Sequence, residues 1–123
     1  KLTVLPIETM WEMWNKVPFI YLNWSHRPLA VMMLALAYRK TAVWNVAKWY
    51  NDEFEALLDE AEGLVDVPKR RAVVAKIQKL LQEEGPRALP FWIEFHTAYD
   101  KRVKGAGVHP MTAVHLENLA MEA

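Results

Sequence analysis

The sequence predicts an α/β protein that contains a long helical hairpin, and three observations support this fold class. Residues 2–5, 7–14 and 19–22 follow a strand, helix, strand order, which is typical of an α/β layer with a right-handed crossover. Residues 51–85 read as two amphipathic helices joined by a tight turn. Residues 89–99 alternate in hydrophobicity along one long strand, with Phe91, Ile93 and Phe95 on one face. Gly105, Gly107 and Pro110 then predict a turn, and residues 114–119 a last strand.

The first 40 residues supply the opening elements. Residues 2–5 are β-prone, and Ile7, Met10, Trp11 and Trp14 fall on one face of a helix. Pro18 ends that helix, and the aromatic and β-branched run at 19–22 suits a buried strand. Residues 29–38 are almost entirely apolar but fall short of the ~18–20 residues of a bilayer span, so we expect a buried helix or a hydrophobic lining.

The hairpin at about 51–85 has clear start and stop signals. Asn51 and Asp66 are expected N-caps of its two helices, and Gly63 is the expected left-handed stop of the first. Gly85 and Pro86 are expected to end the second helix. The two apolar stripes comprise Phe54, Leu57, Leu58, Ala61 and Leu64, then Val73, Val74, Ile77, Leu80 and Leu81. The first helix is acidic and the second basic, which predicts that the charges of the two helices compensate each other.

Composition narrows the function classes. Fifteen basic and fifteen acidic residues give a net charge of zero, which argues against a nucleic-acid or anionic-membrane surface. The chain has no cysteine, so thiolate chemistry and disulfides are excluded. It is 53% hydrophobic, more than one domain of this size needs, so we expect part of its surface to face another polypeptide. The sequence begins at Lys1 without an initiating Met, so we also expect an N-terminal portion to precede it.

Catalytic, metal and cofactor motifs are not found. Glu8 and Glu12 lie one helical turn apart, but such glutamates are more often solvated than paired for catalysis. The four histidines fall on separate predicted elements without a compact ligand spacing, so hydrogen-bonded histidines are favoured over a metal site. With no phosphate-binding glycine loop and no nucleophile elbow, the sequence predicts neither an enzyme nor a bound cofactor.

Two polar and aromatic segments are candidate ligand contacts. Trp24, Ser25, His26 and Arg27 follow the predicted strand at 19–22, and open α/β sheets bind ligands at the carboxyl ends of their strands. Trp44 and Asn45 lie in the irregular segment 39–50. That segment is either a ligand-facing loop or a loop held by its own side chains.

A series of short motifs resembles one known family. They are Asn51, Phe54, Leu57, Leu58, Glu60 and Ala61; Asp66 and Arg70; residues 83–86, Glu-Glu-Gly-Pro; and residues 89–92, Leu-Pro-Phe-Trp. Upstream, Trp24 to Pro28, residues 35–39 and Trp44-Asn45 fit as well, as do residues 103–105 and 116–119. Together they resemble the C-terminal part of extracytoplasmic solute-binding proteins of ABC importers, of the peptide, nickel and opine type (family 5). Glu55 is a departure, since the family usually has Asp there.

The resemblance implies a two-lobed periplasmic-binding-protein fold of type II that closes on a solute without catalysis. Residues 1–88 would belong to the second lobe, and residues 89–123 would form a hinge-crossing strand that returns to the first. The expected partners are a small solute, a membrane permease and the remaining N-terminal part of the same protein, in the periplasm or another extracytoplasmic location. The solute would be peptide-like, opine-like or sugar-acid-like.

Arg27 bears on the class of solute. Peptide-binding members have an Asp near this place that grips the α-ammonium group, which a guanidinium would repel. Arg27 instead suits a carboxylate ligand, and its alternatives are a salt bridge between lobes or a solvent-exposed position. A second reading of the whole chain is a self-contained α/β module whose acidic and basic helices bind a partner protein.

Overall fold

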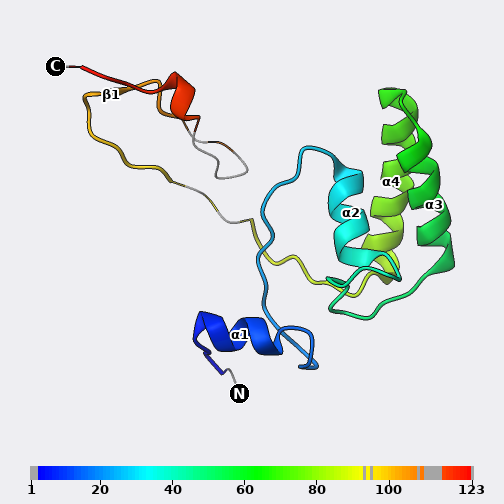
Figure 1. Cartoon of the computed structure of the whole chain (residues 1–123). Coiled ribbons are helices and arrows are strands. Elements are labelled where there is room, and N and C mark those ends of the chain that lie inside the picture. The colour runs from blue at the N-terminus through cyan, green and yellow to red at the C-terminus, as the bar shows by residue number, and fades with distance from the viewer. Residues whose placement is uncertain (1–2, 93, 95, 108, 110–114, 123) are drawn as a thin grey trace. The chain divides into compact units, whose positions relative to one another are not determined.

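A computed structural model describes residues 3–92, 94, 96–107, 109 and 115–122. Two compact units are present. The first comprises Lys1–Leu22 and Pro28–Arg87, and the second comprises Asn23–Arg27 and Ala88–Ala123. The first unit contains helices α1 (Ile7–Met13), α2 (Ala30–Tyr38), α3 (Asp52–Gly63) and α4 (Val67–Glu84) (Figure 1). The second contains strand β1 (Val103–Lys104), the 3-10 helix η1 (Leu116–Asn118) and strand β2 (Ala120–Met121).

The predicted hairpin is confirmed as α3 and α4, which pack along each other (Figure 1). Phe54, Leu58 and Ile77 are fully buried between them, as the apolar stripes predicted. Burying side chains of this size contributes about 1.5–3 kcal/mol each before conformational entropy is subtracted. The rest of the buried core consists of Leu34, Ala61, Val73 and Leu80.

Both predicted N-caps are confirmed. The Asn51 side chain accepts a hydrogen bond from the Phe54 amide at 2.9 Å, and Asp66 accepts one from the Lys69 amide at 2.9 Å. Asn51 also donates to the Glu84 carboxylate at 3.3 Å, so it joins the start of α3 to the end of α4. Each cap supplies an acceptor to a helix N–H group that has no partner within its helix.

The prediction of a left-handed stop at Gly63 is wrong. Among the glycines only Gly105 has a positive φ, and the chain leaves α3 through Leu64 in an extended conformation. The Arg70 guanidinium donates to the Leu64 carbonyl at 2.9 Å. A side chain from α4 therefore satisfies a carbonyl at this helix end, and no left-handed residue is needed.

Helix α2 forms in the apolar run where a buried helix or a hydrophobic lining is expected, and it packs one side against α3 (Figure 1). Leu34 and Ala37 are buried, whereas Met32 and Leu36 on its other side are exposed. The Tyr38 ring at its C-terminal end contacts the Phe54 ring edge to face, with 5.9 Å between centroids. The core of the first unit is therefore built by three helices.

The N-terminal helix is confirmed for Ile7–Met13, but the strands predicted beside it are not formed. None of residues 3–5 or 19–22 is in a strand, and α1 has no buried residue. The rings of Trp11 and Trp14 contact each other edge to face, with 6.2 Å between centroids. The predicted pattern named residues suited to strands, but a strand also needs a neighbouring strand for its N–H and C=O groups.

The long strand predicted at 89–99 is also absent from the described residues of that range, and Ile93 and Phe95 lie outside them. The predicted last strand at 114–119 is wrong for its described residues, because Leu116–Asn118 form η1. Val114 lies outside the described residues. The strand at this end is β2, which begins one residue later than the prediction ended.

In the second unit, β1 and β2 pair antiparallel, with Val103 opposite Met121 and Lys104 opposite Ala120. Gly105 follows β1 with φ +76°, where a Cβ atom would overlap the Asn118 carbonyl oxygen. Only glycine fits both the dihedral angle and this close approach. The predicted turn residue Gly105 is thus explained by its contact with η1.

Candidate functional site

Arg39 joins the end of α2 to the acidic side of α3. Its guanidinium contacts Glu55 at 3.0 Å and both Asp59 and Glu62 at 2.7 Å. The Lys40 amide donates to the second oxygen of Glu55 at 2.6 Å. Burial alone would lower the pKa of Arg39, but hydrogen bonds to Asp59 and Glu62 outweigh it and raise that pKa. The guanidinium is therefore a permanent positive charge.

This cluster corrects the expected compensation between the two hairpin helices. No ion pair between described side chains links α3 to α4; three acids of α3, Glu55, Asp59 and Glu62, instead converge on Arg39. Lys79 of α4 pairs with Glu83 within its own helix at 3.8 Å. The physical reason is geometric, since a planar guanidinium at a helix end reaches several carboxylates on successive turns.

Asn45 holds the loop between α2 and α3. Its side chain is 7% exposed and donates to the carbonyls of Trp49 at 2.8 Å, Tyr38 at 3.3 Å and Arg39 at 3.4 Å. Its oxygen accepts from the Trp49 amide at 3.4 Å. Of the two readings of segment 39–50, these contacts favour a loop held by its own side chains. The loop in turn places Trp49 against Phe54, with 5.4 Å between ring centroids.

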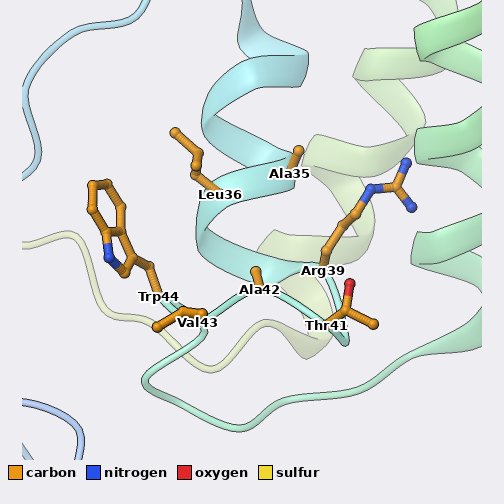
Figure 2. A pocket seen from close by; sticks show the side chains of 7 residues that line it. All are labelled: Ala35, Leu36, Arg39, Thr41, Ala42, Val43 and Trp44. Carbon is orange, nitrogen blue, oxygen red and sulfur yellow. The ribbon is translucent and has the colours of Figure 1, made fainter.

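An open hollow lies where α2 meets this loop (Figure 2). Its volume is about 360 Å³, and its walls are formed by Ala35, Leu36, Arg39, Thr41, Ala42, Val43 and Trp44. The lining is mainly apolar, and Trp44 stands on the wall with 42% of its surface exposed. Figure 2 shows Trp44 and Leu36 on one side of the hollow, while the Arg39 guanidinium is directed away from them. The hollow can therefore offer an indole face and aliphatic groups to an apolar portion of a ligand.

Arg87 fixes the chain that leaves α4 to the end of α2. It donates to the Ala37 carbonyl at 3.3 Å, and its guanidinium carbon lies 4.7 Å from the centre of the Tyr38 ring. Burial lowers the pKa of Arg87 and raises the pKa of Tyr38. The stacked pair keeps α2, and with it one wall of the hollow, in place.

The predicted contacts at 24–27 lie in the second unit, while Trp44 and Asn45 lie in the first. Trp24 and Arg27 are half-buried, and Ser25 and His26 are exposed. Arg27 donates through Nη1 to the carbonyls of His26 at 3.1 Å and Ser25 at 3.5 Å. The guanidinium is thus held beside its own loop, and a ligand role for the four residues stays a prediction.

The described residues include neither a metal-binding cluster nor a membrane-spanning helix. There, no group of three His, Asp or Glu side chains is placed to hold a metal ion. His109 and His115 contact each other at 5.2 Å between ring centroids, and His115 lies 2.8 Å from Glu117. Within the described ranges, no helix combines the length and the apolar character needed to cross a bilayer.

Several lining residues of the hollow were not among the predicted contacts. Trp44 was predicted, but Thr41, Val43 and Arg39 were not. The available signal was a basic residue directly after an apolar helix, followed by an acidic helix that could bind it. No family model, curated protein or solved structure matched the chain in searches for relatives.

Proposed function

We propose that this chain is part of an extracytoplasmic solute-binding protein of an ABC importer. It would contribute to a periplasmic receptor that captures a small solute between two lobes and delivers it to a membrane permease. The solute class is peptide-like, opine-like or sugar-acid-like. The proposal includes no catalytic step and no cofactor.

The observation that carries the proposal is the hollow beside Trp44. Ligand sites are usually concave and mainly apolar, with an aromatic side chain that packs on the ligand. The hollow is open and mainly apolar, and Trp44, one of the ligand contacts that the sequence predicts, stands on its wall. The resemblance of the motifs at 24–28, 44–45 and 51–92 supplies the receptor class.

Exposed apolar side chains support the second half of the proposal, that further parts of the same protein complete the receptor. Phe19 is 90% exposed, Trp92 88% and Leu89 74%. All three lie in segments predicted to be strands, of which the run at 19–22 suits a buried strand. In the proposed receptor these segments pair with strands outside this sequence, which would satisfy their backbone groups and cover their side chains.

Arg27 supports a solute that carries a carboxylate. Both of its backbone contacts are made through Nη1, and a guanidinium has five N–H donors. No described carboxylate lies within 4.0 Å of it, in contrast to Arg39. Held in this way, Arg27 retains donors for a carboxylate of the solute.

The proposal is tested by measuring solute binding to the chain and to Trp44→Ala. Short peptides, opines and sugar acids are titrated in turn, and binding is followed by calorimetry and by tryptophan fluorescence. We expect one class to bind and Trp44→Ala to weaken it on the order of tenfold, the value of one packed aromatic contact. Trp11→Ala is the matched control, because Trp11 is also an exposed indole but lies on α1, outside the hollow.

Two outcomes contradict the proposal. The first is that no solute of the three classes binds either to this chain or to a longer receptor that contains it. The second is that Trp44→Ala binds as tightly as the unchanged chain. Arg27→Ala tests the carboxylate preference separately, since it should reduce the affinity for acidic solutes and leave that for their amides unchanged.

The alternative function is a self-contained interaction module, and it is favoured by the exposed charges of α3 and α4. Thermal unfolding distinguishes the two proposals. A sharp cooperative transition that includes all of these 123 residues supports the module, whereas loose packing outside the core of α2, α3 and α4 supports part of a larger receptor.

A further inference from the structure

The acidic side chains on one side of α3 are paired with Arg39, and those on the other side are unpaired among the described residues. Counting about 100° per residue from the buried Phe54, the acids that bind Arg39 lie about 80–140° to one side. Glu53 and Glu60 lie about 100–120° to the other side. Neither has a described cation within 4.0 Å, and both are exposed. One face of the hairpin thus keeps unpaired carboxylates.

Helix α4 presents unpaired cations toward the same face. Lys69 and Lys76 lie about 80–100° from the buried Ile77, in the same rotational sense as Glu53 and Glu60 on α3. Equal rotational sense in two antiparallel helices means the same face of the pair. Lys69 and Lys76 are exposed, and no described carboxylate lies within 4.0 Å of either.

Each set of charges flanks a small residue, and together they form two ridges with the same spacing. The acidic ridge is Glu53, Ala56 and Glu60, and the basic ridge is Lys69, Ala72 and Lys76. In each ridge the charges are seven residues apart, or about 10.5 Å along the helix. Both alanines are exposed, so the centre of each ridge allows another helix to approach closely.

The ridges are also level with each other across the hairpin. Counted from Val65 in the turn, Glu60 and Lys69 lie at nearly equal heights, and so do Glu53 and Lys76. A rotation of 180° about an axis parallel to the helices preserves height and exchanges the two sides of the face. It therefore places the acidic ridge of one copy over the basic ridge of another, with the helices antiparallel.

We propose that this face of the hairpin is a two-fold interface between two copies of the chain. The partner's Glu53 would meet Lys76, and the partner's Glu60 would meet Lys69, with the alanines at the centre. Symmetry makes each contact twice, so four ion pairs form in one isologous interface. This inference is independent of the solute-binding proposal, because its test contains no solute.

Charge complementarity identifies a second copy as the occupant. An acidic partner surface would be repelled by Glu53 and Glu60, and a basic one would be repelled by Lys69 and Lys76. A second copy offers opposite charge to both ridges at matching spacing. No other partner chemistry is needed to neutralise the face.

The test is sedimentation velocity of the chain over a series of protein and salt concentrations. We expect a reversible dimer that weakens as salt rises, because the screening length falls from about 10 Å at 0.1 M to about 3 Å at 1 M. K69E/K76E makes both ridges acidic and E53K/E60K makes both basic. Each should weaken self-association on the order of tenfold or more.

Mixing the two variants provides the decisive measurement. In the mixture every acidic ridge meets a basic one, so a heterodimer as tight as the original dimer should form. The matched control is R71E/K101E, which changes the net charge by the same amount outside the ridges and should leave the dimer unchanged. Circular dichroism checks that each variant keeps its helices, and K69Q/K76Q replaces any charge-reversed variant that does not fold.

Three outcomes overturn the inference. A chain that stays monomeric at every concentration excludes the interface. A dimer that K69E/K76E or K69Q/K76Q leaves unchanged must use another surface. Two folded charge-reversed variants that do not associate with each other show that the ridges do not pair.

Discussion

Replacing Asn45 by alanine should loosen the loop that connects α2 to α3. The substitution removes a side chain that is 7% exposed and that serves the carbonyls of three residues. Its contact to the Trp49 carbonyl, at 2.8 Å, is a full hydrogen bond, whereas those to Tyr38 and Arg39, at 3.3 and 3.4 Å, are long and weak. A buried acceptor that loses its donor costs about 1–3 kcal/mol.

The expected loss of stability follows from one strong and two weak contacts. We expect the free energy of unfolding to fall by about 1–2 kcal/mol, since water can reach part of the loop and replace the long contacts. For a unit of this size, that change lowers Tm by roughly 4–16 °C. The Trp49 ring contacts both Tyr38 and Phe54, so its fluorescence should report the loosening directly.

Urea unfolding followed by tryptophan fluorescence measures the difference. Asn15→Ala is the matched control, because Asn15 is exposed and its side chain makes no described hydrogen bond. If Asn45→Ala and Asn15→Ala unfold at the same urea concentration, then the four contacts of Asn45 do not hold the loop. Asn45→Asp sharpens the test. It removes the same donors and adds a buried charge, so it should be at least as destabilising as alanine at neutral pH.

Three further predictions concern the core, the ion cluster and the second unit. Phe54→Ala should cost about 3–5 kcal/mol in urea unfolding, whereas Phe19→Ala, whose ring is 90% exposed, should cost almost nothing in the isolated chain. Arg39→Gln should cost about 1–2 kcal/mol and abolish most of the salt dependence of stability; equal salt dependence in both proteins would contradict the role of the cluster. Hydrogen bonds from Arg102 lower the pKa of Asp100, so NMR titration should place this pKa below the ordinary value of an aspartate, and Arg102→Ala should raise it. Because the pKa is lower in the folded state, the small stabilisation from Asp100 is present above its unfolded pKa and is lost as the pH falls through the folded value.

The positions of the helices follow from local sequence signals. Asn51 and Asp66 were assigned as N-caps because a short polar side chain can accept from an amide two or three residues further on, and both do so. The apolar period placed Phe54 and Ile77 in the core for a similar reason, since the spacing of a helix face depends on nearby residues alone. Helix α2 was also expected, from a run too short to cross a membrane.

The strands could not be assigned from the same kind of signal. Residues 19–22 and 89–92 have side chains suited to strands, yet neither run forms a strand in the described structure. A strand is stabilised by hydrogen bonds to a neighbour that is distant in sequence, and apolar alternation does not show whether the neighbour is present. In the proposed receptor, the neighbour lies outside these 123 residues.

The candidate site was likewise predicted only in part from the sequence. Trp44 was predicted from its place in an aromatic, irregular segment, and it does stand on the wall of a hollow. Asn45 was predicted beside it as a ligand contact, but the structure places its amide among the carbonyls of its own loop. Neighbouring residues in a loop can point to opposite sides, and sequence adjacency does not distinguish the side that faces solvent from the side that faces the core.

The sequence by itself determined the hairpin, its two N-caps, its buried stripes and the acidic and basic character of its helices. Only the tertiary structure decided which charges meet. Arg39, which lies outside the hairpin, forms ion pairs with Glu55, Asp59 and Glu62. Glu53 and Glu60, on the opposite face of α3, are left without an ion pair to a described side chain. Caps and stripes depend on residues within a few positions, whereas an ion pair depends on where folding brings distant side chains.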